Sequence, residues 1–136
     1  MDRLGDRRNF ETMNEIVLSL LGHTWILDLD GTIVKHNGYK IDGMDTFLEG
    51  AEDFLRSIPK ADMIIFLTSR TEAWKEKTID FLLEHNIKYD YIIFNVPYGE
   101  RILINDDKPG GLGTGITIRG RRDGNFLPKI KIDASL

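Results

Sequence analysis

Oxygen-bearing and charged side chains gather in three segments of the sequence, 28–32, 68–70 and 105–108, and each segment follows a short apolar run. Together they supply four carboxylates, three hydroxyls and two cations, namely Asp28, Asp30, Asp106 and Asp107, Thr32, Thr68 and Ser69, and Arg70 and Lys108. The chain has no cysteine, which excludes disulfides, thiolate nucleophiles and cysteine-based metal sites. The remaining chemistry is that of carboxylates and hydroxyls, with a hard metal ion.

Four carboxylates placed together repel one another, and their pKa values rise unless a cation holds them. A divalent ion that prefers oxygen ligands, Mg2+ above all, is therefore expected. Such a metal beside hydroxyl and cationic groups suits phosphoryl transfer, because it stabilises charge on the phosphoryl oxygens. Asp28 and Asp30 lie on one side of an extended strand, so one can attack phosphorus while the other handles the leaving-group proton. The spacing does not choose between them, and it also fits a plain polar turn.

The elements that position these residues are predicted from apolar periodicity and turn signals. Strands are expected at 25–29, 62–68, 91–94 and 102–104, with weaker ones at 116–118 and 130–132, and helices at 46–58 and 71–86. The expected capping pairs of these helices are Thr46 with Glu49 and Ser69 with Glu72. Asn37-Gly38 predicts a two-residue turn of a β-hairpin within 33–41.

Residues 1–24 are expected to hold an N-terminal amphipathic helix. One helical face carries Met13, Ile16, Val17, Leu20 and Leu21, and Thr12 with Glu15 matches a capping box. Glu11 and Glu15 interrupt the apolar stretch and no small-residue cleavage site follows, which argues against a secretory signal.

Strands that alternate with helices predict an α/β fold, a three-layer Rossmann-like parallel sheet with helices on both faces. Ligands of such sheets bind at the carboxyl ends of the strands, where the three polar segments lie. With 136 residues, the chain is expected to be a single domain, 1–136, in which 110–136 forms C-terminal strands and a tail.

The composition, 41% hydrophobic and 29% charged, is typical of a soluble globular protein. The net charge of −4 argues against a general nucleic-acid binder. A basic stretch at 119–131 is expected to be a solvated edge, with contact to an anionic substrate as the alternative. The longest apolar runs are far shorter than the roughly 20 residues of a membrane-spanning helix. We therefore expect a cytoplasmic protein without a membrane partner.

The order and spacing of the three segments resemble the haloacid dehalogenase superfamily. Asp28-Leu29-Asp30-Gly31-Thr32 resembles its first motif, Thr68 after 64–67 its second, and Asp106-Asp107 after 102–104 its fourth. The expected hairpin lies where this superfamily carries a small flap. The resemblance covers about residues 25–109.

The resemblance implies a role for each matched residue. Asp28 would be the nucleophile that forms an aspartyl-phosphate, and Asp30 the general acid and base. Thr68 would bind the transferring phosphoryl group. The implied Mg2+ ligands are Asp28, Asp30, Asp106 and Asp107, and the residues expected near the phosphate or substrate are Leu29, Gly31, Thr32, Ser69 and Arg70. For Arg70 a surface ion pair is the alternative, and for Ser69 a helix cap.

The superfamily's third motif is a lysine that neutralises the phosphate, and the expected position holds Val96 instead. Three nearby cations could replace it: Lys108, Arg101 and Lys88. Lys108 is favoured as the catalytic cation because it directly follows the acid pair. If none of the three reaches the site, catalysis should be weak or absent.

Segments 33–42 and 69–90 are too short to hold the cap domain of larger members. The site is therefore expected to be open, for a large phosphorylated substrate, or covered by a second subunit of a homo-oligomer. The resemblance implies a Mg2+-dependent phosphomonoesterase, acting on a small phosphorylated metabolite such as a phosphosugar or polysaccharide-biosynthesis intermediate. The alternatives are a weak or inactive phospho-ligand binding or regulatory module, and a nucleic-acid end phosphatase.

Overall fold

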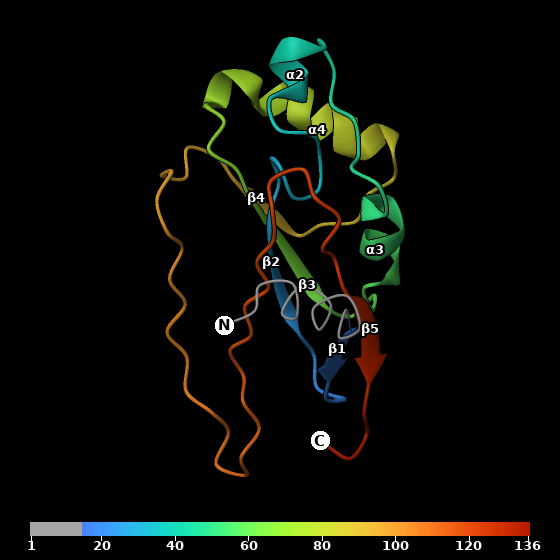
Figure 1. Cartoon of the computed structure of the whole chain (residues 1–136), viewed down its shortest axis with the longest axis vertical. Coiled ribbons are helices and arrows are strands. Elements are labelled where there is room, and N and C mark those ends of the chain that lie inside the picture. Colours follow the sequence, from blue (N-terminus) through green and yellow to red (C-terminus); the bar gives the residue numbers. More distant parts are fainter. Residues whose placement is uncertain (1–14) are drawn as a thin grey trace, which may run out of the picture.

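A computed structural model describes residues 15–136, which form a small α/β structure with parallel sheets (Figure 1). Its elements in chain order are β1 (Glu15–Leu18), β2 (Thr24–Asp28), α2 (Gly38–Ile41), α3 (Ala51–Ser57), β3 (Met63–Leu67), the 3-10 turn η1 (Glu72–Trp74), α4 (Lys75–Glu84), β4 (Tyr91–Ile93) and β5 (Lys129–Ile132). Within this range no helix has the length and apolar character needed to cross a membrane.

The central sheet has the strand order β2-β3-β4, and both pairs are parallel. Its strands are short runs of isoleucine and other apolar residues, which pack well on a pleated surface. The register aligns Asp28 of β2 with Leu67 of β3 and Leu67 with Ile93 of β4. The carboxyl ends of β2 and β3 therefore meet, as the sequence predicts, and bring segment 28–32 next to segment 68–70.

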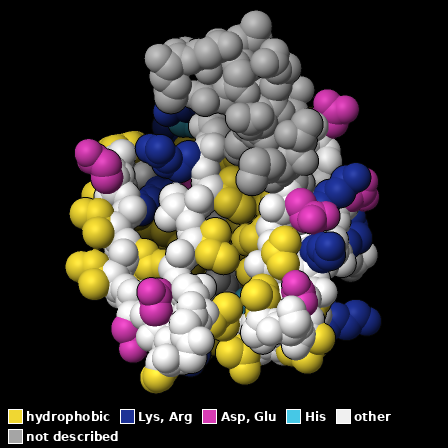
Figure 2. All heavy atoms as spheres, turned by 60° about the horizontal axis from the view of Figure 1, so that its bottom comes forward, with side chains coloured by type: hydrophobic (Ala, Val, Ile, Leu, Met, Phe, Trp, Pro, Cys, Tyr) yellow, Lys and Arg dark blue, Asp and Glu magenta, His cyan; other side chains and the backbone are white. Residues whose placement is uncertain are grey.

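One face of this sheet forms the core. Trp25, Leu27, Ile64 and Phe66 belong to one buried cluster with Ala51, Phe54 and Leu55 of α3 and Leu82 of α4. The ring of Trp25 meets the ring of Phe54 edge-on, with centroids 5.7 Å apart. On the other face Ile26, Tyr91 and Ile93 are at least half exposed, and hydrophobic side chains are visible on the surface in Figure 2. Among residues 15–136 the helices α3 and α4 thus cover one face of the sheet.

The predicted N-terminal helix is wrong for the part that the structure describes. Ile16 and Val17 lie in β1, which pairs in parallel with β5, and Leu18 is buried in the core. The tertiary pairing with β5 supplies backbone partners that a local periodicity cannot reveal. The weak strand predicted at 130–132 is confirmed by the same pairing. Thr12 and Met13 lie outside the described residues.

The predicted hairpin at 33–41 is also wrong, because Asn37-Gly38 begins the short helix α2. Asn37 adopts a left-handed conformation with φ 58° and its carbonyl accepts hydrogen bonds from the N–H groups of Lys40 and Ile41. Within α2, Tyr39 packs its ring against the ring of Trp74, with centroids 4.6 Å apart. The Tyr39–Trp74 contact holds this segment as a helical turn beside a cavity. The second strand of the predicted hairpin therefore does not form.

The two predicted helices behave differently. The helix at 71–86 is confirmed as η1 followed by α4, although Ser69 donates to the carbonyl of Val96 and does not cap it. The helix predicted at 46–58 begins only at Ala51, after Gly50 with φ 79°. Residues 46–47 are extended instead, because the carbonyl of Thr46 accepts a hydrogen bond from Lys35 and Phe47 pairs with Val34.

The strands predicted at 102–104 and 116–118 do not form. Residues 94–128 run as a long segment without a ladder partner, drawn from yellow to orange-red in Figure 1. Ile102 and Ile104 are 83% and 91% exposed. Unlike the three-residue strand β4, which pairs with β3, this run has no neighbouring strand to pair with and buries little apolar surface.

Asp62, just before β3, joins the amino ends of β2 and β3. Its carboxylate accepts hydrogen bonds from the Trp25 indole at 3.0 Å and the His23 backbone N–H at 3.1 Å, and the His23 Nδ1 lies 2.8 Å away. Burial acts to raise the pKa of Asp62, but the hydrogen bonds from Trp25 and His23 hold this pKa below its ordinary value. The ionised form is therefore favoured by folding, and its stabilising contribution is lost in acid.

Asp62→Asn is expected to lower the free energy of unfolding at pH 7 by about 1–3 kcal/mol, because buried donors lose a charged acceptor. Since the folded-state pKa is lowered, the difference from the wild type should shrink as the pH falls below the ordinary value of 3.8. Urea unfolding at several pH values measures both effects, with Asp80→Asn on the exposed surface of α4 as the control. A difference that stays constant in acid would contradict this role for Asp62.

Candidate active site

Asp28 ends β2 and faces a cavity of about 510 Å3. One carboxylate oxygen accepts a hydrogen bond from the Thr32 hydroxyl at 2.9 Å, and the other accepts one from Nη1 of Arg101 at 2.7 Å. The side chain of Asp28 is 36% exposed, and that of Arg101 is 35% exposed. Asp28 is thus a carboxylate that is oriented by two donors and still accessible from the cavity.

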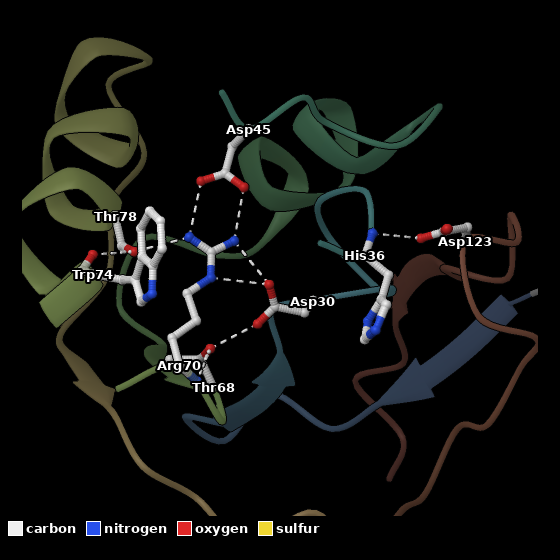
Figure 3. Close-up of polar contacts among 8 residues, drawn as sticks. All are labelled: Asp30, His36, Asp45, Thr68, Arg70, Trp74, Thr78 and Asp123. Atoms are coloured by element: carbon white, nitrogen blue, oxygen red, sulfur yellow. Dashed lines mark hydrogen bonds and ion pairs between the residues drawn. The ribbon is translucent and has the colours of Figure 1, made fainter. Parts of the chain in front are cut away.

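Asp30 has different surroundings, although it lies only two residues further along the chain (Figure 3). One of its oxygens accepts a hydrogen bond from the Thr68 hydroxyl at 2.7 Å. The other accepts two from Arg70, from Nε at 3.0 Å and from Nη2 at 2.8 Å. The Asp30 side chain is only 15% exposed, so its position is fixed from the protein side.

The guanidinium of Arg70 is hydrogen-bonded to three side chains and stacks on the ring of a fourth. Besides Asp30 it binds Asp45 through two hydrogen bonds, Nη1 to Oδ2 at 2.9 Å and Nη2 to Oδ1 at 2.7 Å, and it donates to the Thr78 hydroxyl at 2.8 Å (Figure 3). Its guanidinium stacks on the ring of Tyr39, 3.8 Å from the centroid. Burial acts to lower the pKa of Arg70, but the hydrogen bonds and charges of Asp45 and Asp30 raise it above its ordinary value. Arg70 therefore stays charged, although only 3% of it is exposed.

The sharp loop after β2 explains how two neighbouring acids reach such different surroundings. Leu29 continues the sheet, since its N–H donates to the carbonyl of Leu67, and its side chain is buried in the core. Gly31 then turns the chain with φ 85°, a conformation that glycine adopts without strain, and its N–H donates to the carbonyl of Val34. Leu29, expected near the phosphate, is thus a core residue, whereas Gly31 and Thr32 line the cavity.

The hydroxyls after β3 have partners within the protein. Thr68, expected to bind the transferring phosphoryl group, is fully buried, donates to Asp30 and does not line the cavity. Ser69 lines the cavity, but its hydroxyl donates to the carbonyl of Val96 at 2.6 Å. Arg70, expected near the substrate or in a surface ion pair, is a positioning residue for Asp30. Thr68 and Arg70 therefore position the carboxylate of Asp30, and a bound phosphate would be contacted by other residues.

The predicted four-carboxylate set is not assembled. Asp106 and Asp107 are exposed in the long segment and do not line the cavity that holds Asp28 and Asp30. Within residues 15–136 no group of three or more aspartate, glutamate, histidine or cysteine side chains could hold a metal. Of the two carboxylates that line the cavity, Asp28 is the more accessible, with 36% of its side chain exposed against 15% for Asp30. The described residues therefore do not bring together the four carboxylates expected as Mg2+ ligands.

The three candidate replacements for the missing lysine are placed apart. Arg101 reaches Asp28, whereas Lys88 donates to the carbonyl of Asp62 at the opposite end of β3. Lys108 lies exposed in a turn, where its N–H donates to the carbonyl of Leu112, and it does not line the cavity. The preference for Lys108 thus has no support in the structure, and Arg101 is the cation at the carboxylate.

Sequence reasoning missed Asp45 and the ring of Tyr39. Asp45 is one of several acids around the start of the predicted helix 46–58, and Tyr39 falls in the predicted hairpin 33–41. Both act only by meeting Arg70, a contact across 25 residues for Asp45 and 31 for Tyr39. No local sequence signal could have identified them.

No protein-family model and no curated protein matches the chain. A search of the solved structures finds a chain of the "Structure of Pnkp1/Rnl/Hen1 complex", with 23% sequence identity and a TM-score of 0.46. The match covers 61% of this chain and 31% of that chain, so the present sequence spans less than half of its length. A likeness at this level carries no argument about fold or function.

Asp45→Asn is expected to lower the free energy of unfolding by about 3–5 kcal/mol, because it leaves a buried guanidinium without one of its carboxylates. The amide nitrogen of asparagine cannot accept a hydrogen bond from Arg70. Urea unfolding at pH 7 measures the loss. Asp42→Asn is the matched control, since Asp42 makes an exposed ion pair with Lys35 on the same segment and should cost less than about 1 kcal/mol. Equal losses in the two variants would show that the buried pair has no special weight.

Proposed function

We propose that this chain is a phosphomonoester hydrolase of the capless haloacid dehalogenase type, with Asp28 as the nucleophile. The observation that carries the proposal is the contrast between two carboxylates at one strand end. Asp28 faces the cavity between Thr32 and Arg101, whereas Asp30 is locked by Thr68 and Arg70. Two acids with different surroundings are the arrangement in which one attacks and the other moves protons.

In the proposed first step an oxygen of Asp28 attacks phosphorus. The bond from this oxygen to phosphorus forms, and the bond from phosphorus to the ester oxygen breaks. Arg101, which already binds Asp28, stabilises the charge on the phosphoryl oxygens. Asp30 gives its proton to the departing ester oxygen, which leaves as an alcohol.

In the proposed second step water hydrolyses the aspartyl-phosphate. Asp30, now ionised, accepts a proton from the water as its oxygen bonds to phosphorus, and the Asp28 carboxylate leaves. Thr68 and Arg70 hold Asp30 in one orientation through both proton transfers, since they bind it from the protein side. This fixed geometry avoids the cost of reorienting the acid during the reaction.

The proposal includes the three-layer arrangement and the Mg2+ requirement implied by the resemblance. When bound, Mg2+ would neutralise charge on the phosphoryl oxygens. Whether activity requires Mg2+ can be tested by removing the ion, without knowing which residues bind it. A phospho-ligand binding module without turnover is the second candidate. It is favoured by the positions of Asp106 and Asp107 away from the cavity that holds Asp28.

Purified protein with Mg2+ is expected to release phosphate from p-nitrophenyl phosphate, and EDTA should abolish this release. Asp28→Asn should lower kcat by about a thousandfold or more, because an amide cannot form the acyl phosphate. Asp42→Asn, on the exposed ion pair, should keep the wild-type rate. Full activity of Asp28→Asn would refute its role as nucleophile. Mg2+-dependent binding of phosphate esters without turnover would favour the binding module.

Arg101→Met is expected to lower kcat/KM by about a hundredfold, because the guanidinium at Asp28 would stabilise the transferring phosphoryl group. Lys108→Met should stay within about twofold of the wild type, since Lys108 does not line the cavity. The two variants are compared in the same phosphate-release assay. A large loss for Lys108→Met with little change for Arg101→Met would show that Lys108 takes the place of the missing lysine.

A further inference from the structure

The cavity in front of Asp28 is much larger than a phosphoryl group needs. Its volume of about 510 Å3 lies in the range of pockets that enclose whole small-molecule ligands. Beyond the strand ends it is lined by parts of three other segments, which contribute His36 and Lys40, Tyr98 and Arg101, and Gly120 and Arg122. The part of a substrate beyond its reacting phosphate would therefore contact the residues of these three segments, which form the wall of the cavity away from the strand ends.

Arg122 is held at this wall by the residue that follows it. The N–H of Asp123 donates to the carbonyl of Gly31 at 2.8 Å, and the carboxylate of Asp123 accepts the N–H of His36 at 2.8 Å (Figure 3). Asp123 has the left-handed φ of 60°, which turns the chain at this point. Through these two hydrogen bonds, Asp123 attaches the long segment 94–128 to the loop that follows Asp28.

The contact between Arg122 and Gly31 is close. A Cβ atom at position 31 would lie 3.1 Å from Cγ of Arg122, tighter than ordinary contacts between side chains. The stem of Arg122 therefore rests on the glycine of the first motif, one residue after Asp30. An exposed arginine is usually a solvated side chain, but this one is placed at the cavity by its backbone.

The charges that line the cavity are not balanced. Arg101 is paired with Asp28, and Arg70 is paired with Asp30 and Asp45. Lys40 and Arg122 also line the cavity, and within residues 15–136 neither has an ion pair. The wall away from the strand ends therefore offers positive charge to a ligand.

We infer that the substrate carries a carboxylate as a second anionic group, and that Arg122 binds this carboxylate as a specificity-determining residue. The inference deepens the proposed function and rests on it for the reacting phosphoryl group. That group meets Asp28 and Arg101, and the second anion lies on the wall of Arg122, with Lys40 as a further cation. A charge-assisted hydrogen bond to an arginine gives both affinity and orientation.

The test uses phosphate esters that differ only by a carboxylate. The three-carbon pair is glycerol 3-phosphate and 3-phosphoglycerate, and the six-carbon pair is glucitol 6-phosphate and 6-phosphogluconate, so that each pair exchanges a terminal hydroxymethyl group for a carboxylate on an open chain. In at least one pair, kcat/KM of the wild type should be about tenfold or more higher for the carboxylate. Arg122→Gln should remove this preference and leave the other member of the pair within about twofold.

Arg121→Gln is the matched control, because Arg121 is the neighbouring arginine and does not line the cavity. It should keep the preference of the wild type. Equal losses on both members of each pair in Arg122→Gln would overturn the inference, because Arg122 would then bind the reacting phosphoryl group. No preference of the wild type in either pair would overturn it as well.

A binding measurement separates this inference from the proposed function. Calorimetric titration of Asp28→Asn with the same four compounds reports affinity without turnover. Suppose that the wild type releases no phosphate, that Asp28→Asn binds the carboxylate-bearing member of a pair more tightly, and that adding Arg122→Gln removes this difference in affinity. The proposed function then fails and the inference stands. If phosphate is released without any preference that depends on Arg122, the inference fails and the proposed function stands.

Discussion

The structure around the candidate site depends on one buried guanidinium. Arg70 leaves the end of β3 and binds Asp30 after β2, Asp45 before α3 and Thr78 on α4. A buried charge is tolerated only when it is paired and hydrogen-bonded, so the position of Arg70 determines where these three side chains lie. The same side chain stacks on Tyr39 and so also fixes α2 above the site.

This constraint gives Asp28 and Asp30 different surroundings. Asp30 is fixed by groups of the protein interior, and Asp28 is left facing the cavity with Arg101 and Thr32. Residues after β3 and on α4 fix the position of Asp30 and its partner Arg70, whereas loops line the cavity through which a ligand reaches Asp28. Such a division is expected at sites where a rigid scaffold positions groups and loops meet the ligand.

The long segment 94–128 decides what the cavity offers. It brings Arg101 to Asp28 and Arg122 to Gly31, and it keeps Asp106 and Asp107 at the surface. The backbone N–H groups of Asn95, Val96 and Asp123 attach it to the site by donating to the carbonyls of Arg70, Thr68 and Gly31, respectively. The chemistry proposed for the strand ends therefore depends on a segment without regular secondary structure.

The sequence by itself determined the parallel strands β2 and β3, helix α4 and the place of Asp28 and Asp30 at the carboxyl end of β2. Short apolar runs and helical periodicity are local signals, so they can be recognised without knowing the fold. Tertiary structure decided that 15–18 pairs with β5, that Asn37-Gly38 starts a helix, and which arginine meets which carboxylate. Those outcomes depend on partners between 25 and more than 100 residues away, and local patterns carry no information about such distant partners.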